Sequence, residues 1–201
     1  LRSLVVIISI VLGLWAGMFS VAMILGLNEQ RMDSALNSYL SHVQIHHPSF
    51  NENFDIEYTI TKKDELLKEI VESKEIKAAS SRIKITGMAS TAHGSTGVQV
   101  IGIDPDQEKN VTVVAKSLIK GSYFSKIKSK PVIIGEELAE KLRLDIGKKI
   151  YIAFINDSGN QQRMKLKVEG IFKTASTLFD GANLFMKKED LNTIIGNEST
   201  V

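Results

Sequence analysis

The start of the chain is apolar and uncharged over an unusual length. No charged side chain occurs between Ser3 and Asn28, and the run from Leu4 to Leu27 is almost wholly apolar. About 20 apolar residues are enough for a helix to cross a bilayer. The pattern therefore predicts a transmembrane helix over residues 1–27.

The charges that flank this run predict its orientation. Arg2 precedes the run and Glu29 follows it, so the positive-inside rule places the N-terminus in the cytoplasm and the rest of the chain outside. A cleaved signal peptide is an alternative, with residues 20–22 as the cleavage site, but apolar residues continue past them. A buried soluble helix is disfavoured because the remaining chain is too short to wrap one of this length.

Small residues recur every fourth position inside the run, at Ser9, Gly13 and Gly17. This spacing places them on one helix face, where a second helix can approach closely. These three residues are the candidate site for packing between membrane helices. Glycine is also simply frequent in membrane helices, and both interpretations remain open.

After the membrane run, the pattern of apolar residues first stays helical and then changes. Met32, Leu36 and Tyr39 keep helical spacing, which predicts a stalk helix over residues 28–40. Residues 42–47 alternate between polar and apolar and precede Pro48, so a first strand is expected there.

The rest of the chain shows short helix and strand patterns in a mixed order. The spacing of apolar residues predicts helices over 61–71, 136–142 and 187–195, the first with a capping-box-like start at Thr61. Strands are expected over 76–86, 98–103, 132–135, 150–155, 164–172 and 183–186, with polar or glycine-rich connections at 93–97 and 156–160. No fixed-period repeat is present. The expected fold class is α+β, with one compact outer unit of two lobes.

Composition excludes several kinds of function. The chain has 201 residues, a net charge of +2 and no cysteine. Balanced, interleaved charges leave no basic field for nucleic acid, so no nucleic-acid partner is expected. The lack of cysteine rules out disulfides, thiolate metal sites and cysteine nucleophiles.

The sequence also lacks the common catalytic patterns. The phosphate-binding loop, the dinucleotide glycine motif, the zinc-protease helix and the serine nucleophile elbow are all absent. His42, His46 and His47 fall on different faces of the expected strand and have no further ligands at metal spacing, so they are interpreted as surface residues. His93 is interpreted as part of an exposed loop. We therefore expect no enzyme activity, no cofactor and no metal.

Several motifs resemble a known membrane-protein family. They are residues 132–142, followed by Gly147 and residues 168–172. Together they resemble the outer core domain of MacB/LolC/LolE/FtsX-type ABC transporter permeases. Residues 100–105 with Glu108, and the Gly-Ser-Tyr-Phe turn at 121–124, are most similar to the lipoprotein-releasing LolC/LolE branch.

The resemblance implies a particular domain organisation. A porter-like βαβ lobe would comprise residues 41–115 and 183–201, and an inserted β-rich lobe would comprise residues 116–182. Such permeases carry three further membrane helices, and Leu1 is not an initiator methionine, so the sequence is expected to be a fragment cut at both ends.

The resemblance also implies a function. The chain would belong to a permease subunit of the bacterial inner membrane, with residues after about 40 in the periplasm. A cytoplasmic ABC ATPase, a second permease copy or homologue, and a periplasmic or outer-membrane protein are the expected partners. ATP hydrolysis would drive extraction or export of a lipoprotein or another amphiphile. The alternatives are an FtsX-like scaffold that activates an extracytoplasmic hydrolase, a MacB-like efflux component, and a membrane-anchored enzyme or sensor.

Overall fold

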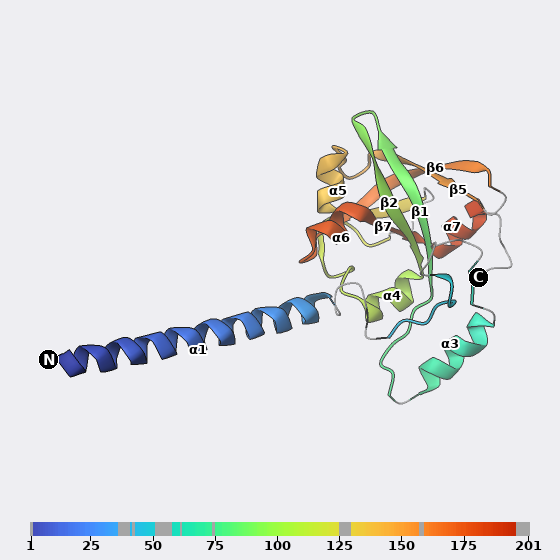
Figure 1. Ribbon diagram of the computed structural model, residues 1–201. Coiled ribbons are helices and arrows are strands. Elements are labelled where there is room, and N and C mark those ends of the chain that lie inside the picture. The colour runs from blue at the N-terminus through green and yellow to red at the C-terminus, as the bar shows by residue number, and fades with distance from the viewer. Residues whose placement is uncertain are drawn as a thin grey trace.

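The protein consists of a long N-terminal helix and a β-rich domain (Figure 1). The computed structural model describes residues 2–35, 41, 43–50, 58–60, 62–73, 75–124, 130–156 and 159–195. Helix α1 (Arg2–Ala35) has 34 residues, which corresponds to a length of about 51 Å at 1.5 Å per residue. It extends away from the domain, and its apolar span Arg2–Gln30 has no buried part.

Helix α1 confirms the expected helix and extends it towards the domain. It continues past the apolar run through Ala35, as expected for the first part of the stalk, whereas residues 36–40 lie outside the described residues. Two serine hydroxyls in α1 donate to backbone carbonyls one turn earlier: Ser9 to Val5 and Ser20 to Ala16, both at 2.8 Å. These bonds satisfy the polar groups within the helix, as an apolar surrounding requires.

The strand expected over residues 42–47 is wrong for its described part. Residues 43–47 are irregular and lead into a turn, in which the amide of Phe50 donates to the carbonyl of His47 at 3.0 Å. The ring of His47 stacks on Tyr58 at 5.1 Å between ring centroids. Alternating residues form a strand only beside a pairing partner, and no described strand pairs with this segment. His42 lies outside the described residues.

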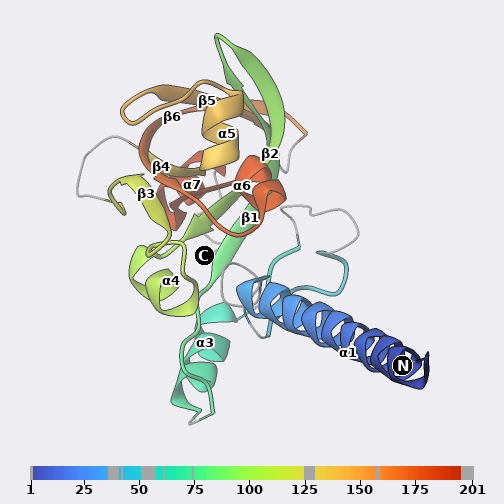
Figure 2. The same cartoon turned by 90° about the vertical axis from the view of Figure 1, so that its left-hand side faces the viewer.

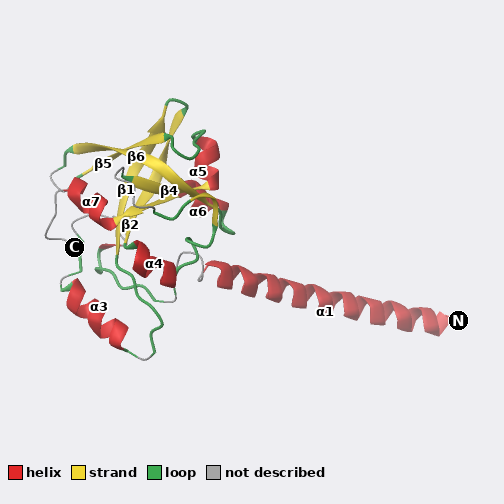
Figure 3. Ribbon diagram, turned by 180° about the vertical axis from the view of Figure 1, so that it is seen from behind, coloured by secondary structure: helices red, strands yellow, loops and turns green. Residues whose placement is uncertain are grey.

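Helix α3 (Lys63–Glu72) confirms the helix expected after this segment, but its start differs. The N-cap residue is Lys62, which has a left-handed backbone (φ 58°) and makes no capping bond with its side chain. Thr61 lies outside the described residues. Figure 3 shows α3 set apart from the strands, on the side of α4.

Strands β1 (Arg82–Thr91) and β2 (Gly94–Ile103) form a long antiparallel hairpin. Thr91 pairs with Gly94, so the turn consists of only two residues. The glycine- and serine-rich residues 94–97 were expected in the connection, and they belong to β2 instead. Cross-strand hydrogen bonds extend the strand through residues whose own propensity disfavours it.

Seven strands form one sheet that closes into a ring. The remaining strands are β3 (Leu118–Gly121), β4 (Pro131–Gly135), β5 (Lys149–Ile155), β6 (Gln161–Phe172) and β7 (Asn183–Lys187). The order is β3-β6-β4-β7-β2-β1-β5, and β5 pairs again with β6. Six strands therefore surround a barrel interior, and β3 extends it at β6 (Figure 2).

The pairings confirm the strands expected over 132–135, 150–155, 164–172 and 183–186, whereas the strand expected over 76–86 begins only at Arg82 and continues to Thr91. The β5–β6 hairpin lies where alternation predicted it, with Lys149 opposite Lys167 and Ile155 opposite Gln161. Strand β7 pairs in parallel with β2 and antiparallel with β4. Helices α5 (Glu136–Lys141) and α7 (Lys188–Ile195) follow β4 and β7 directly, as expected.

The sequence interpretation missed two short helices and strand β3. Helix α4 (Pro105–Val111) begins at Asp104, whose carboxylate accepts hydrogen bonds from the amides of Asp106 at 2.9 Å and Gln107 at 3.4 Å. A capping aspartate before proline at the first helical position is a recognisable start signal. Helix α6 (Thr177–Ala182) begins at Ser176, whose hydroxyl accepts from the amide of Phe179.

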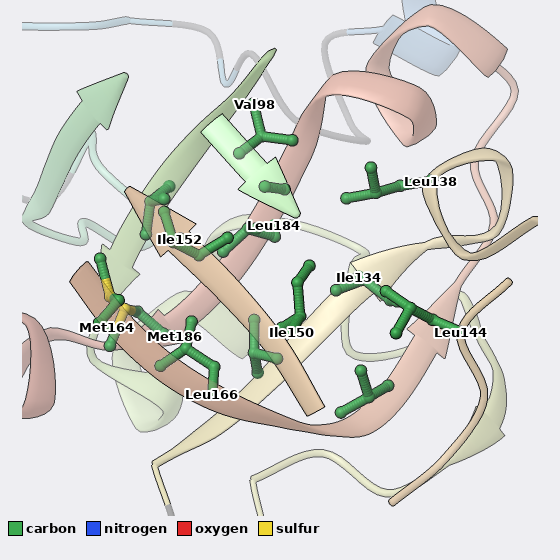
Figure 4. Packing of buried hydrophobic residues seen from close by; sticks show 14 of the residues in the cluster. Val98, Ile134, Leu138, Leu144, Ile150, Ile152, Met164, Leu166, Leu184 and Met186 are labelled. Atoms are coloured by element: carbon green, nitrogen blue, oxygen red, sulfur yellow. The ribbon is translucent and has the colours of Figure 1, made fainter. Parts of the chain in front are cut away.

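The core lies on both faces of the central strands. The larger cluster fills the barrel and includes Ile134, Leu166 and Leu184 (Figure 4). A second cluster on the outer face includes Phe172 and Phe185, whose rings meet edge to face at 5.5 Å. Alternate residues of β4 and β7 therefore enter different clusters, which explains why these strands are continuously apolar.

The predicted lobes share this one sheet. Strands β1, β2 and β7 come from the predicted porter-like lobe, and β3 to β6 come from the predicted inserted lobe. Strand β5 pairs with β1, and β4 pairs with β7. The boundaries at residues 115 and 182 stay a prediction.

Candidate functional site

The long helix is the first candidate site, because its apolar surface is uncovered. Each large apolar side chain from Leu4 to Leu27 is at least 44% exposed, and the span has a mean hydropathy of 2.5. By length and composition this helix can cross a membrane. The structure removes the alternative of a buried core helix, because no part of the span packs inside the domain.

The predicted packing residues lie open on this helix. A Cβ added to Gly13 or Gly17 would meet no atom within 4 Å, and the hydroxyl of Ser9 is occupied by the carbonyl of Val5. The three residues keep their four-residue spacing and lie on one face. Packing of a second helix against them stays a prediction.

A buried ion pair anchors α4 to the start of β1. The Glu108 side chain is fully buried, and its Oε1 lies 2.7 Å from Nη2 of Arg82. Arg82 Nε donates to Oε2 at 3.1 Å, so the contact is bidentate. The hydroxyls of Ser80 (2.9 Å) and Thr112 (3.0 Å) also donate to the carboxylate. Both oxygens of Glu108 are thus satisfied, which a buried carboxylate requires.

A polar cleft of about 200 Å³ opens beside this ion pair. The lining combines two basic side chains, a hydroxyl, three amides and an apolar floor: Gln44, Arg82, Lys84, Gln99, Ile101, Thr112, Phe179, Asn183 and Phe185. Because Lys84 pairs with Ile101 and Ile101 with Phe185, these three residues form one row across the outer face of the sheet.

Lys84 is the distinctive group in the cleft. Burial and the charge of Arg82 lower the pKa of Lys84, and Glu108 partly offsets this effect. Sequence reasoning missed this residue, since Lys84 is one of many lysines in alternating segments. Its neighbours Thr112, Phe179 and Asn183 come from distant parts of the chain, so no local signal marks the cleft.

The histidines do not form a site among the described residues. His46 is exposed, and His47 contacts Tyr58 and the amide of Ser49. His93 occupies the exposed turn between β1 and β2. Within the described ranges, no three His, Cys, Asp or Glu residues are placed to hold a metal ion.

The motifs that resemble the permease family build the framework of the domain. Gly121 has φ +80°, and a Cβ there would lie 2.1 Å from the carbonyl oxygen of Glu169. A Cβ on Gly170 would meet the carbonyl of Ser122 at 2.9 Å. The Gly-Ser-Tyr-Phe turn and residues 168–172 therefore pack against each other through glycines.

Comparison with protein-family models identifies the family to which this framework belongs. The model for the MacB-like periplasmic core domain matches residues 3–199. The chain belongs to this family. The MacB-like domain accounts for the motifs at 121–124, 132–142 and 168–172, and the expectation of a MacB/FtsX-type chain is confirmed. Membership of the LolC/LolE branch stays a prediction.

Solved structures resemble the MacB-like domain at low sequence identity. The extracellular domain of the noncanonic ABC-type transporter YknZ from Gram-positive bacteria is 17% identical, with a TM-score of 0.49, and the match covers 66% of each chain. A domain of a putative permease from Porphyromonas gingivalis is 14% identical, with a TM-score of 0.40, and the match covers 64% of this chain. The matches span 66% and 59% of those two chains, less than two thirds. The search of curated protein sequences gave no match.

The fold class is α+β, with an N-terminal apolar helix followed by a β-rich domain that matches the MacB-like periplasmic core domain.

Proposed function

We propose that the chain is part of an ABC transporter permease subunit, in which the outer domain works on a lipoprotein or another exported amphiphile. One observation carries this proposal: an apolar helix without any buried part leads into a MacB-like periplasmic core domain. The subunit pairs in the membrane with a second copy or a homologue, and a cytoplasmic ATPase supplies the energy.

The geometry of α1 supports mechanical coupling. The span Arg2–Gln30 has 29 residues and a length of about 43 Å, which matches a bilayer with its headgroup regions. Helix α1 continues to Ala35 without a break. A continuous helix keeps a fixed rise, so tilting in the membrane moves its outer end as a rigid body.

The domain also has the rigidity that a moving part needs. Its barrel closes through hydrogen bonds on all sides, and its two apolar clusters share the central strands. A packed, closed barrel transmits displacement instead of deforming locally. Motion of the domain then moves the substrate outside the membrane, and the domain needs no catalytic group for this role.

Release of lipoproteins from spheroplasts tests this function. The full-length protein is depleted in the organism that encodes it, and lipoproteins are labelled with radioactive palmitate. The amount of labelled lipoprotein released to the soluble fraction is then measured. We expect release to fall severalfold and to recover with the intact gene. In cells whose partner ATPase binds but does not hydrolyse ATP, the intact gene should not restore release.

Unchanged lipoprotein release on depletion would contradict the lipoprotein assignment. If cell-wall hydrolysis fell instead, the FtsX-like alternative would replace it. The intact gene reintroduced on a plasmid is the control for loss of neighbouring gene expression.

A further inference from the structure

We infer that the cleft at Lys84 is a binding site for a monoanionic oxyanion, a carboxylate or a phosphodiester. Nothing in the permease role requires this site, so the inference goes beyond the proposed function. The site is defined by the Lys84 ammonium group, which has no hydrogen-bond or ion-pair partner among the described residues, by amide groups around it and by an apolar floor.

The charge balance of the cleft favours one negative charge. Arg82 and Lys84 are cationic, but the guanidinium of Arg82 is held bidentately by the buried carboxylate of Glu108. No hydrogen bond or ion pair holds the Lys84 ammonium among the described residues, so one positive charge is left without compensation. A single anionic group restores neutrality in a partly buried place, where attraction between opposite charges is stronger than in water.

The size of the cleft sets a limit on the ligand. Its volume of about 200 Å³ is below the roughly 300–1,000 Å³ of pockets for drug-sized ligands. A carboxylate or a phosphodiester with its adjoining carbons fits this volume. A compact ammonium binds such groups as a point charge and does not require the planar fork of arginine.

The walls supply the remaining contacts. Gln99 and Asn183 lie opposite each other on β2 and β7, so their side chains reach the same face. The amide of Asn183 donates to the carbonyl of Phe179 at 3.0 Å, which fixes its orientation. Ile101 and Phe185 form the apolar floor, suited to the carbon atoms next to the anionic group.

The cleft also touches the segment that follows the membrane helix. Gln44 lines it and lies nine positions after Ala35, the end of α1. An anion in the cleft therefore contacts the sheet, α6 and this connecting segment together. A bound anion would hold residues 43–47 against the barrel.

Nuclear magnetic resonance of the full chain in uncharged detergent micelles tests the site. Dimethyl phosphate and acetate are titrated separately, with sodium chloride at equal ionic strength as the reference. We expect saturable shifts of the backbone amides at Lys84, Gln99 and Asn183. The Lys84→Met variant keeps the length of the side chain and should weaken binding at least tenfold.

The matched control is Lys149→Met, because Lys149 is exposed on β5 and does not line the cleft. It should leave the affinity within twofold of the parent. Lys84→Gln serves as a second variant if Lys84→Met does not give the parent spectrum outside the cleft.

A lipid headgroup and a soluble anion are distinguished in nanodiscs. If phosphatidylglycerol nanodiscs shift the same amides without added probe and phosphatidylcholine nanodiscs do not, the phosphodiester comes from lipid. Shifts from the small probes alone indicate a soluble ligand. The site is refuted if shifts grow linearly with concentration, equal those in sodium chloride, or persist in both Lys84 variants.

Discussion

Gly135 shows how a single hydrogen atom in place of a side chain decides the packing of this domain. It ends β4 and is the N-cap of α5, with an ordinary φ of −72°. A Cβ on Gly135 would lie 2.1 Å from the carbonyl oxygen and 2.5 Å from the Cα of Asp180. Both atoms are backbone, so a larger residue would have to push α6 off the sheet.

We expect Gly135→Ala to lower the free energy of unfolding by about 3 kcal/mol, the upper part of the usual range for overpacking. Gly97→Ala is the control, since a Cβ there meets nothing within 4 Å. Urea titration followed by circular dichroism measures both. Tryptophan fluorescence would not serve, because the single tryptophan, Trp15, lies on α1. Equal stability of the two variants would contradict the close approach.

Glu108 is a second decisive residue, because its carboxylate is buried and fully bonded. Removing one partner of a buried ion pair leaves an uncompensated charge, at a cost of about 3–5 kcal/mol. We expect Glu108→Gln to lose stability in this range, measured by the urea midpoint. In the control Asp106→Asn, the exposed pair with Lys109 is broken, and no measurable change is expected. A small effect of Glu108→Gln would show that Arg82 finds another acceptor.

The lowered pKa of Lys84 predicts how the stability of the domain depends on pH. Burial lowers the pKa of Lys84, so between the folded and unfolded pKa values the unfolded chain binds more protons and stability rises with pH. At neutral pH, without anion, Lys84→Met should therefore be more stable than the parent. This difference should shrink as the pH approaches 10.5, the ordinary value for lysine. Melting temperatures at a series of pH values measure it, and a constant difference would refute the account.

At the scale of elements, α1 combines a lipid-like surface with a face of small residues. Gly26 provides an internal comparison on the same helix. It lies nine positions after Gly17, which is half a turn around the axis at 100° per residue. Like Gly13 and Gly17, it has no neighbouring atom within 4 Å. Helix propensity and available space are therefore the same, and only the face differs.

We predict that Gly13→Leu and Gly17→Leu weaken association of α1 with a partner helix without preventing membrane insertion, because leucine keeps the backbones apart. Gly26→Leu should leave association unchanged. Co-purification of differently tagged copies of the full-length subunit, or of the subunit with its homologue, measures this. Equal association in all three variants would remove Ser9, Gly13 and Gly17 as a packing site.

The helices of the outer domain differ in how far local sequence predicts them. Helices α5 and α7 follow directly after apolar strands and carry apolar residues at helical spacing, and both were predicted. Helices α4 and α6 have seven and six residues and were not predicted. Only their caps, Asp104 and Ser176, give a local signal. The segment 43–47 shows the reverse case, since its alternation is present but no described strand pairs with it.

At the scale of the whole molecule, the orientation of the chain in the membrane can be tested directly. The sequence contains no cysteine, so an introduced cysteine is the only one in this chain. His93, exposed at the tip of the β1–β2 hairpin, is a suitable position. We expect His93→Cys to react with a membrane-impermeant maleimide in intact spheroplasts, and Ser3→Cys to react only after permeabilisation. The opposite result would invert the orientation.

The sequence by itself determined the features that depend on neighbouring residues. An uncharged run long enough to cross a bilayer forms a helix there, because lipid offers no hydrogen-bond partner for the backbone. Two-residue alternation on both sides of a polar connection was sufficient for the β5–β6 hairpin. The motifs around residues 121–124, 132–142 and 168–172 were sufficient for the family.

Only the tertiary structure decided which strands meet and which polar groups are buried. The ring closes through three residue pairs between β1 and β5, about 60 positions apart in the chain. Glu108 reaches Arg82 across 26 positions, and the cleft at Lys84 gathers residues from Gln44 to Phe185. Burial and pairing depend on partners distant in sequence, and a local pattern contains no information about which partner is near.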